Sequence, residues 1–125
     1  MRYLFDSNII IMTVMAMNEA LRRRVGDCDE GDIVTSAIAY AEVAYGAVRG
    51  KLPRLDQLQA FVEEAPVLSF DLKAAHAYTS LPFRRASFDH LIAAHALSHG
   101  LILVTDNERD FAGIPDLDVE NWTKE

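Results

Sequence analysis

The chain begins with a short apolar run that stops at an acid and then turns apolar again. Residues 3–5 are Tyr, Leu and Phe, Asp6 follows, and the small polar residues Ser7 and Asn8 lead into a second apolar segment. This pattern is typical of a buried parallel strand followed by a helix. In open α/β sheets, ligands bind beyond the carboxyl ends of such strands. Asp6 therefore either caps the next helix or belongs to a ligand site.

Segments typical of strands and helices alternate along the rest of the chain. Further strands are expected at 33–35, 67–70, 101–105 and 118–120, and helices at 9–25 with a break near Asn18, 36–49, 55–64, 71–79 and 88–99. Ser36 and Ser87 suit helix starts, and Gly100 suits a helix end. Such alternation predicts a parallel sheet with helices on both faces. We therefore expect residues 1–125 to form a single domain, a three-layer α/β/α sandwich with a short central parallel sheet.

Composition narrows the class of protein. Half of the residues are hydrophobic and a quarter are charged, as in ordinary globular domains. No apolar run reaches the roughly 18 residues of a membrane helix, and the start of the chain lacks the features of a secretion signal. Cys28 is the single cysteine, so an internal disulfide and a multi-cysteine zinc site are excluded. The default expectation is a cytoplasmic protein.

The net charge of −7 argues against a passive nucleic-acid-binding surface, which usually carries a basic excess. Basic residues nevertheless gather at 22–24, at 49–54 and at 84–85. Each group is interpreted first as a solvated helix face or end. Acids that gather in one pocket and hold divalent cations would reverse the local field.

Glu42 is the most informative acid in the chain. It is the only charged residue between positions 36 and 48 and is surrounded by alanine, isoleucine, valine and tyrosine. A helix that is apolar nearly all round is expected to be buried. A buried carboxylate needs a partner or a metal. The alternative is that Glu42 lies on a narrow exposed stripe of the helix.

Asp89 falls in the first turn of the helix expected at 88–99, where the helix dipole alone favours an acid. His90, His95 and His99 lie on or near the same helix. His95 and His99 are four residues apart, but no Glu or third ligand completes a zinc pattern. We interpret these histidines as packing or surface residues.

Asp106 repeats the pattern of Asp6, because the apolar run 101–105 ends at it, and Asp110 follows four residues later. If the two strands are neighbours in one parallel sheet, Asp6 and Asp106 come together. Clustered carboxylates repel one another and bind protons or cations. An oxygen-rich site suits Mg²⁺ or Mn²⁺, and such ions support phosphodiester hydrolysis.

Four segments, YLFDSNI, AYAEVAYGA, SFDHLIAAHAL and LVTDNERDF, resemble those of the PIN-domain ribonucleases in order and setting. More narrowly, the chain resembles the VapC-type toxins of bacterial toxin–antitoxin pairs, over essentially its whole length. The resemblance implies a metal-dependent endoribonuclease that acts on RNA, is inhibited by a cognate VapB-type antitoxin and forms a homodimer. It also implies that Asp6, Glu42, Asp89 and Asp106 hold one or two Mg²⁺ or Mn²⁺ ions.

The resemblance also assigns roles to individual side chains. Asp6 would be a central ligand, Asp89 and Asp106 would complete the metal cage, and Glu42 would coordinate through water or orient the nucleophile. Side chains that hold the carboxylates in place or share the fourth acid's role would be Ser7, Asn8, Thr105, Asn107 and Asp110. The span 70–89 is shorter than in many relatives, which affects the substrate groove. Arg84 and Arg85, just before Asp89, are the candidates for gripping substrate phosphates.

Other classes of function were weighed against this one. A receiver domain would need an acidic pair after its first strand and a lysine after its last, neither of which is present. A phosphatase with an aspartyl nucleophile would need a second Asp where Asn8 stands. A non-catalytic binding module with the same fold remains open.

Overall fold

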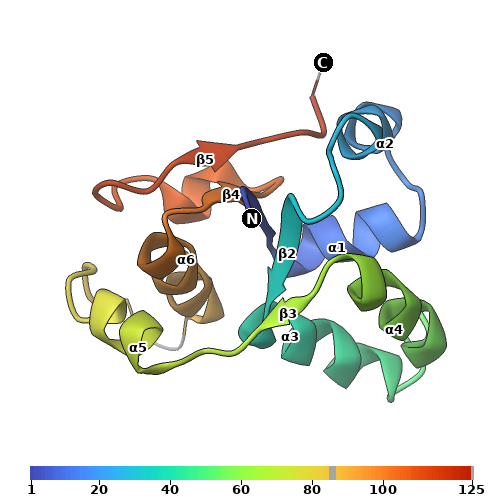
Figure 1. Ribbon diagram of the computed structural model, residues 1–125. Helices are drawn as coiled ribbons and strands as arrows, with labels where there is room; N and C mark the ends of the chain where they lie inside the picture. Colours follow the sequence, from blue (N-terminus) through green and yellow to red (C-terminus); the bar gives the residue numbers. More distant parts are fainter. Residues whose placement is uncertain (85–86, 125) are drawn as a thin grey trace.

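A computed structural model describes residues 1–84 and 87–124. Its centre is a sheet of five parallel strands in the order β3-β2-β1-β4-β5 (Figure 1). The strands are β1 (Tyr3–Phe5), β2 (Ile33–Ser36), β3 (Val67–Leu68), β4 (Ile102–Val104) and β5 (Val119–Glu120). The α/β fold with a short central parallel sheet, predicted from the alternation of segments, is confirmed.

Helices cover both faces of the sheet. They are α1 (Ser7–Val14), α2 (Glu19–Gly26), α3 (Ala37–Ala47), α4 (Leu55–Glu64), α5 (Leu72–Tyr78) and α6 (Phe88–His99), with a 3₁₀ helix, η1, at Glu108–Phe111. Helices α1, α3 and α4 pack against one another on one side of the sheet, and α5 packs on α6 on the other (Figure 1). None of these helices has the length and apolar character that a membrane crossing requires, among the residues described.

The local signals for helix ends act as expected. Asn18 caps α2 by accepting a hydrogen bond from the Leu21 amide at 2.9 Å, so the expected helix at 9–25 is two helices with the break where it was predicted. Ser36 and Ser87 cap α3 and α6, and Gly100 ends α6 in the left-handed conformation at φ 63°. These caps satisfy backbone groups that a helix end otherwise leaves without partners.

Two expectations need correction. Helix α3 is not buried all round, because Ala41 is exposed and Tyr45 is 63% exposed. Only Ala39 and Val43 on α3 are fully buried, so the apolar composition of this helix reflects an uncovered apolar surface and not burial. The strand expected at 67–70 is shorter, and η1 was not foreseen because residues 107–111 carry no helical hydrophobic pattern.

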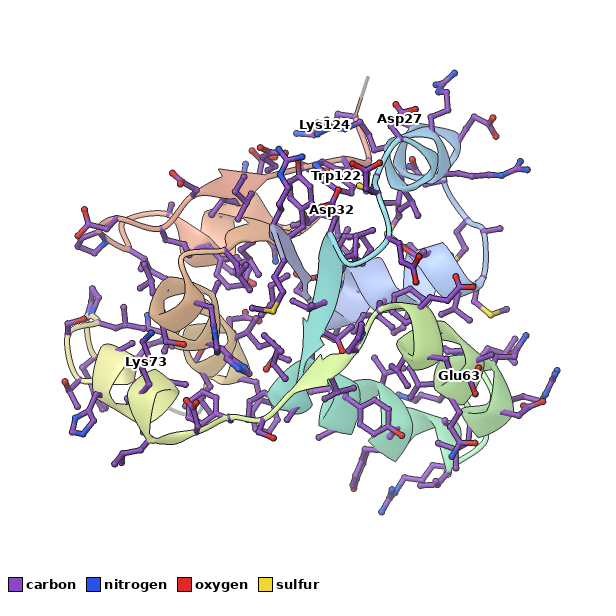
Figure 2. All side chains as sticks on the ribbon, viewed as in Figure 1. Asp27, Asp32, Glu63, Lys73, Trp122 and Lys124 are labelled. Carbon is purple, nitrogen blue, oxygen red and sulfur yellow. The ribbon has the colours of Figure 1, made fainter. Side chains whose placement is uncertain are left out.

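Strand β1 forms the core of the molecule, with helices packed on both of its faces. Tyr3, Leu4 and Phe5 are all buried. Trp122, which lies beside α2 in Figure 2, packs its ring against Tyr3 and Phe5 with centroid distances of 4.7 and 5.6 Å. Asp6 directly follows this buried strand.

Candidate functional site

The strand order reverses direction between β1 and β4. From β1 the chain continues outward through β2 to β3, and it then crosses to β4 on the opposite side of β1. Such a reversal of direction is the place where open α/β sheets bind ligands. Because Phe5 pairs with Val104, Asp6 and Thr105 emerge side by side and Asp106 follows one residue later. The two strands that end at Asp6 and Asp106 are therefore neighbours, as the sequence analysis required for these acids to come together.

Asp6 is a buried acid, with only 6% of its surface exposed. Its Oδ1 accepts a hydrogen bond from the Ile9 amide at 3.0 Å, and its Oδ2 accepts one from the Thr105 hydroxyl. Burial raises the pKa of Asp6 from 3.8 to about 6; the charges of Asp106 and Asp89 add to the shift, and the two hydrogen bonds oppose it. Asp6 thus caps α1, as one interpretation of the sequence predicted, and the charges of Asp106 and Asp89 also act on it.

Thr105 connects Asp6 to the loop after β4. While its hydroxyl donates to Asp6, its oxygen accepts a hydrogen bond from the Asn107 amide at 3.0 Å. The Asn107 side chain in turn donates to Asp110 Oδ2 at 2.6 Å. Three of the five supporting side chains proposed from the sequence thus form one connected chain of hydrogen bonds. Such chains hold carboxylates in fixed orientations.

Asp89 reaches the same region from the first turn of α6. Burial raises the pKa of Asp89, and the neighbouring carboxyl of Asp110 raises it further, both as a hydrogen-bond partner and as a negative charge. Arg84 opposes this shift. Its guanidinium donates to the Asp110 carbonyl at 3.2 Å and lies 3.7 Å from Asp110 Oδ1. Arg84 therefore lies at the edge of the acid cluster, whereas Arg85 lies outside the described residues.

Glu42 approaches from α3 and is half-buried. Burial raises the pKa of Glu42, the negative charge of Asp89 raises it further, and the Ser7 hydroxyl opposes the shift. Glu42 Oε1 is buried and accepts no hydrogen bond from any described residue. Ser7 and the exposed Asn8 lie with Glu42 in one shallow hollow. The charges of Asp106 and Asp89 thus act on Asp6, and the charge of Asp89 also acts on Glu42.

The acids do not form a ready-made metal cage. No three His, Cys, Asp or Glu side chains within 1–84 and 87–124 lie close enough together to hold an ion as they stand. Their chemistry nevertheless fits a hard divalent cation, because every donor is a carboxylate oxygen and Glu42 Oε1 is a buried acceptor without a partner. Burial and neighbouring negative charges raise the pKa values of Asp6, Glu42 and Asp89. A cation bound among these carboxylates would offset their repulsion and would therefore be stabilised.

His95 is a core residue, as interpreted from the sequence. It is fully buried, and its Nδ1 lies 2.8 Å from the Ser36 hydroxyl oxygen, which ties α6 to the start of α3. Burial lowers the pKa of His95, so the neutral ring is favoured. Tyr45 and Phe88, which are exposed beside Glu42, were not singled out from the sequence. The basic residues at 49–54, directly after α3, were the sequence feature that could have drawn attention to this region.

The chain is similar to proteins of one known family. The sequence model of the PIN domain family matches residues 3–117. The chain is 31% identical to the tRNA(fMet)-specific endonuclease VapC of Shigella flexneri, over 98% of this chain and 99% of that protein. It is 30% identical to the protein of the same name in Salmonella typhimurium, over 98% of both chains.

Solved structures show the same relationship. VapBC2 from Rickettsia felis, bound to a promoter DNA fragment, contains a chain that matches at a TM-score of 0.85 and 26% identity, over 98% of this chain and 99% of that one. DNA-bound VapBC from Salmonella typhimurium matches at a TM-score of 0.82 and 29% identity, over 98% of both chains. The chain therefore belongs to the PIN domain family. The relatives named here are VapC proteins, so the predicted resemblance is confirmed.

The raised pKa of Asp6 predicts a pH dependence of stability in metal-free protein. A folded-state pKa of about 6 against 3.8 means that the folded protein binds this proton more tightly than the unfolded chain. The stability that protonated Asp6 contributes is fully present below about pH 4 and is lost as the pH rises through 6. Over this range the free energy of unfolding falls by up to about 3 kcal/mol. Urea denaturation from about pH 4 to 7 should show this loss relative to Asp6→Asn. Parallel curves for the two proteins would contradict it.

Thr105→Val is expected to weaken the site without unfolding the protein. The change keeps the shape of the side chain but removes the hydroxyl that donates to Asp6 and accepts from Asn107. Loss of such a supporting hydrogen bond typically costs roughly 10- to 100-fold in metal affinity or activity. Titration calorimetry with Mn²⁺ measures the affinity, and Thr105→Ser, which keeps the hydroxyl, should remain close to the parent. An unchanged affinity in Thr105→Val would show that Asp6 needs no such support.

Proposed function

We propose that residues 1–125 act as one nuclease domain, a metal-dependent endoribonuclease that is the toxin of a VapBC-type toxin–antitoxin pair. The observation that carries the proposal is that β1 and β4 pair at the switch point of the sheet, so that Asp6 and Asp106 follow neighbouring strands, while the charge of Asp89 acts on both Asp6 and Glu42. The relatives named as endonucleases, which cover nearly the whole chain, support the same activity.

PIN-domain nucleases generally use divalent metal ions, and Mg²⁺ or Mn²⁺ is proposed here. Asp6, Glu42, Asp89 and Asp106 would hold the metal, which would supply Lewis acidity to the phosphate and lower the pKa of the attacking water. Thr105 and the Ile9 amide hold the Asp6 carboxylate in place. Glu42 Oε1, a buried acceptor without a partner, would take a hydrogen bond from the attacking water and orient it.

Hydrolysis then joins the water oxygen to phosphorus and releases the ribose oxygen of the neighbouring nucleotide. One proton of the attacking water passes to a carboxylate, and a protonated carboxyl donates a proton to the leaving oxygen as its bond to phosphorus breaks. Groups with raised pKa values suit this exchange near neutral pH. Arg84, at the edge of the cluster, is proposed to contact a substrate phosphate.

The cognate partner is proposed to be a VapB-type antitoxin, because the matching solved structures are VapBC complexes. The protein is further proposed to act in the cytoplasm as a homodimer. Co-purification with the product of a neighbouring gene tests the antitoxin. Light scattering tests the dimer, and a monomer at working concentration would exclude it.

The test of the proposed function is cleavage of labelled RNAs by the purified chain. The panel includes total cellular RNA and initiator tRNA, since two relatives are named as specific for tRNA(fMet). We expect cutting that requires Mg²⁺ or Mn²⁺ and stops with EDTA. Membership of the PIN family removes the receiver and phosphatase alternatives. Binding of metal without cutting of any RNA would favour the non-catalytic binding module.

A further inference from the structure

The outward side of α3 next to Glu42 is apolar and uncovered. Tyr45 is 63% exposed, and Phe88, at the start of α6, is 58% exposed. With Ile38 and Ala41 these rings line an open hollow of about 460 Å³, and Glu42 forms part of its wall. A contiguous exposed apolar surface on a polar protein marks a binding site. This one includes the candidate metal-binding acid Glu42 in its lining, and Phe88 directly precedes Asp89 in the chain.

Arg49 covers one face of the Tyr45 ring. The Arg49 guanidinium lies 3.4 Å from the ring centroid and also donates to the Tyr45 carbonyl at 3.0 Å. Tyr45 also lines the apolar hollow, so a flat ligand could stack on its ring there. Nucleobases stack on aromatic rings in single-stranded nucleic-acid sites, and arginine planes add to such stacks.

A second hollow lies on the other side of Glu42 and Tyr45. It measures about 230 Å³, and Ser7, Asn8 and Lys51 contribute to its lining. The stem of Lys51 lies along α3, since a Cβ atom at Gly46 would lie 3.5 Å from Lys51 Cδ, and the Lys51 amide donates to the Gly46 carbonyl at 3.0 Å. Lys51 thereby places a cation in the same hollow as Glu42, on a chain with net charge −7.

We propose that the two hollows bind one unpaired nucleotide of the RNA substrate. The base stacks on Tyr45 and Phe88 in the apolar hollow, and a neighbouring phosphate meets Lys51 and Arg49. Charge complementarity favours RNA here, because the carboxylates repel phosphates and the two cations at the end of α3 offset that repulsion. A paired base has its faces covered by stacking, so the site selects single-stranded RNA. This inference rests on the proposed nuclease function and specifies its substrate.

The experiment measures RNA binding without cleavage, in an Asp6→Asn background with Mg²⁺. The probe is a fluorescein-labelled single-stranded RNA of mixed sequence, followed by anisotropy, and the same RNA in a duplex. Tyr45→Ala and Phe88→Ala should each weaken binding of the single strand roughly tenfold. Lys51→Met should reduce the slope of log affinity against log salt by about 0.7.

The matched controls lie on α5. Leu72→Ala removes another exposed apolar side chain, and Lys73→Met removes a lysine on α5, which Figure 2 labels. Neither should change binding. In the cleaving protein, Tyr45→Ala should raise KM with little change in kcat, because the ring binds a base away from the reacting phosphate.

Several outcomes would overturn the inference. These are no binding of the single strand, equal affinity for the duplex, or equal losses in the α5 controls. If Tyr45→Ala turned a dimer into a monomer in light scattering and left RNA binding unchanged, the face would belong to an interface between copies. Since binding is measured without cutting, failure of the nuclease proposal would appear separately, as bound RNA that the Asp6-containing protein does not cleave.

Discussion

Asp6→Asn should reduce RNA cleavage at least roughly 100- to 1,000-fold while the metal-free protein stays at least as stable as the parent. The loss is expected because Asp6 is buried directly after β1 and is influenced by the charges of both Asp89 and Asp106. Replacing its carboxylate by an amide removes one full negative charge from the cation site. The amide oxygen is a much weaker ligand for a hard divalent ion.

Stability should not fall, because Asn is as good a helix cap as Asp and retains an oxygen for the Ile9 amide. The amide also avoids the cost of burying a charge, which raises the pKa of Asp6 to about 6. Loss of the acceptor for Thr105 offsets part of that gain. Thermal denaturation at neutral pH without metal measures the net change in stability.

Asp71→Asn is the matched control for this prediction. Asp71 caps α5 as Asp6 caps α1, with its Oδ1 accepting from the Ala74 amide at 3.0 Å, but it is exposed and outside the acid cluster. Cleavage by Asp71→Asn should equal that of the parent. If Asp6→Asn still cut RNA at a comparable rate, or lost activity only because it unfolded, the assignment of Asp6 would fail.

Trp122→Ala should lower the free energy of unfolding by about 3–5 kcal/mol, the usual cost of truncating a buried tryptophan. The ring is 1% exposed and packs edge-on against Tyr3 and Phe5. Its Nε1 donates to Glu120 at 2.8 Å, and the Arg24 guanidinium lies 4.6 Å from the ring. One side chain thus joins the end of the chain and α2 to the central strand. A large cavity would open directly behind Phe5, the residue before Asp6.

Urea denaturation followed by far-ultraviolet circular dichroism suits this test, because Trp122 is the only tryptophan and its fluorescence is lost with it. Trp122→Phe should cost less, since it keeps most of the buried apolar surface and loses the bond to Glu120. Phe83→Ala removes an exposed ring and should change stability by no more than about 0.5 kcal/mol. A cost for Trp122→Ala near that of Phe83→Ala would show that the C-terminal segment is not part of the core.

Most of the secondary structure could be predicted from local signals. The bounds of α4 and α6 match those expected, and the break near Asn18 occurs where its side chain can cap a new helix. These features depend on residues within a few positions of one another, so they are readable along the chain. The alternation of elements then restricts the topology to parallel α/β arrangements.

The site could be predicted only as a set of residues. Asp6 and Asp106 were recognisable because each ends an apolar strand, and their meeting depended on β1 and β4 being neighbours. The pairing of β1 with β4 is part of the strand order, and no local sequence pattern specifies the order of strands in a sheet. The link from Thr105 through Asn107 to Asp110 likewise depends on the turn after β4, which the hydrophobic pattern does not specify.

Helix α3 shows most clearly which features the sequence determines and which depend on the tertiary structure. The sequence by itself determined that this segment is a helix, that Ser36 starts it and that Glu42 is its one charged residue. Only the tertiary structure decided that the apolar surface around Tyr45 stays uncovered beside the acids. An apolar side chain is equally compatible with a core and with an exposed binding surface, because burial depends on which elements pack there. The hydrophobicity of each residue can be read from the sequence, whereas burial of a surface depends on how all the elements of the chain pack together.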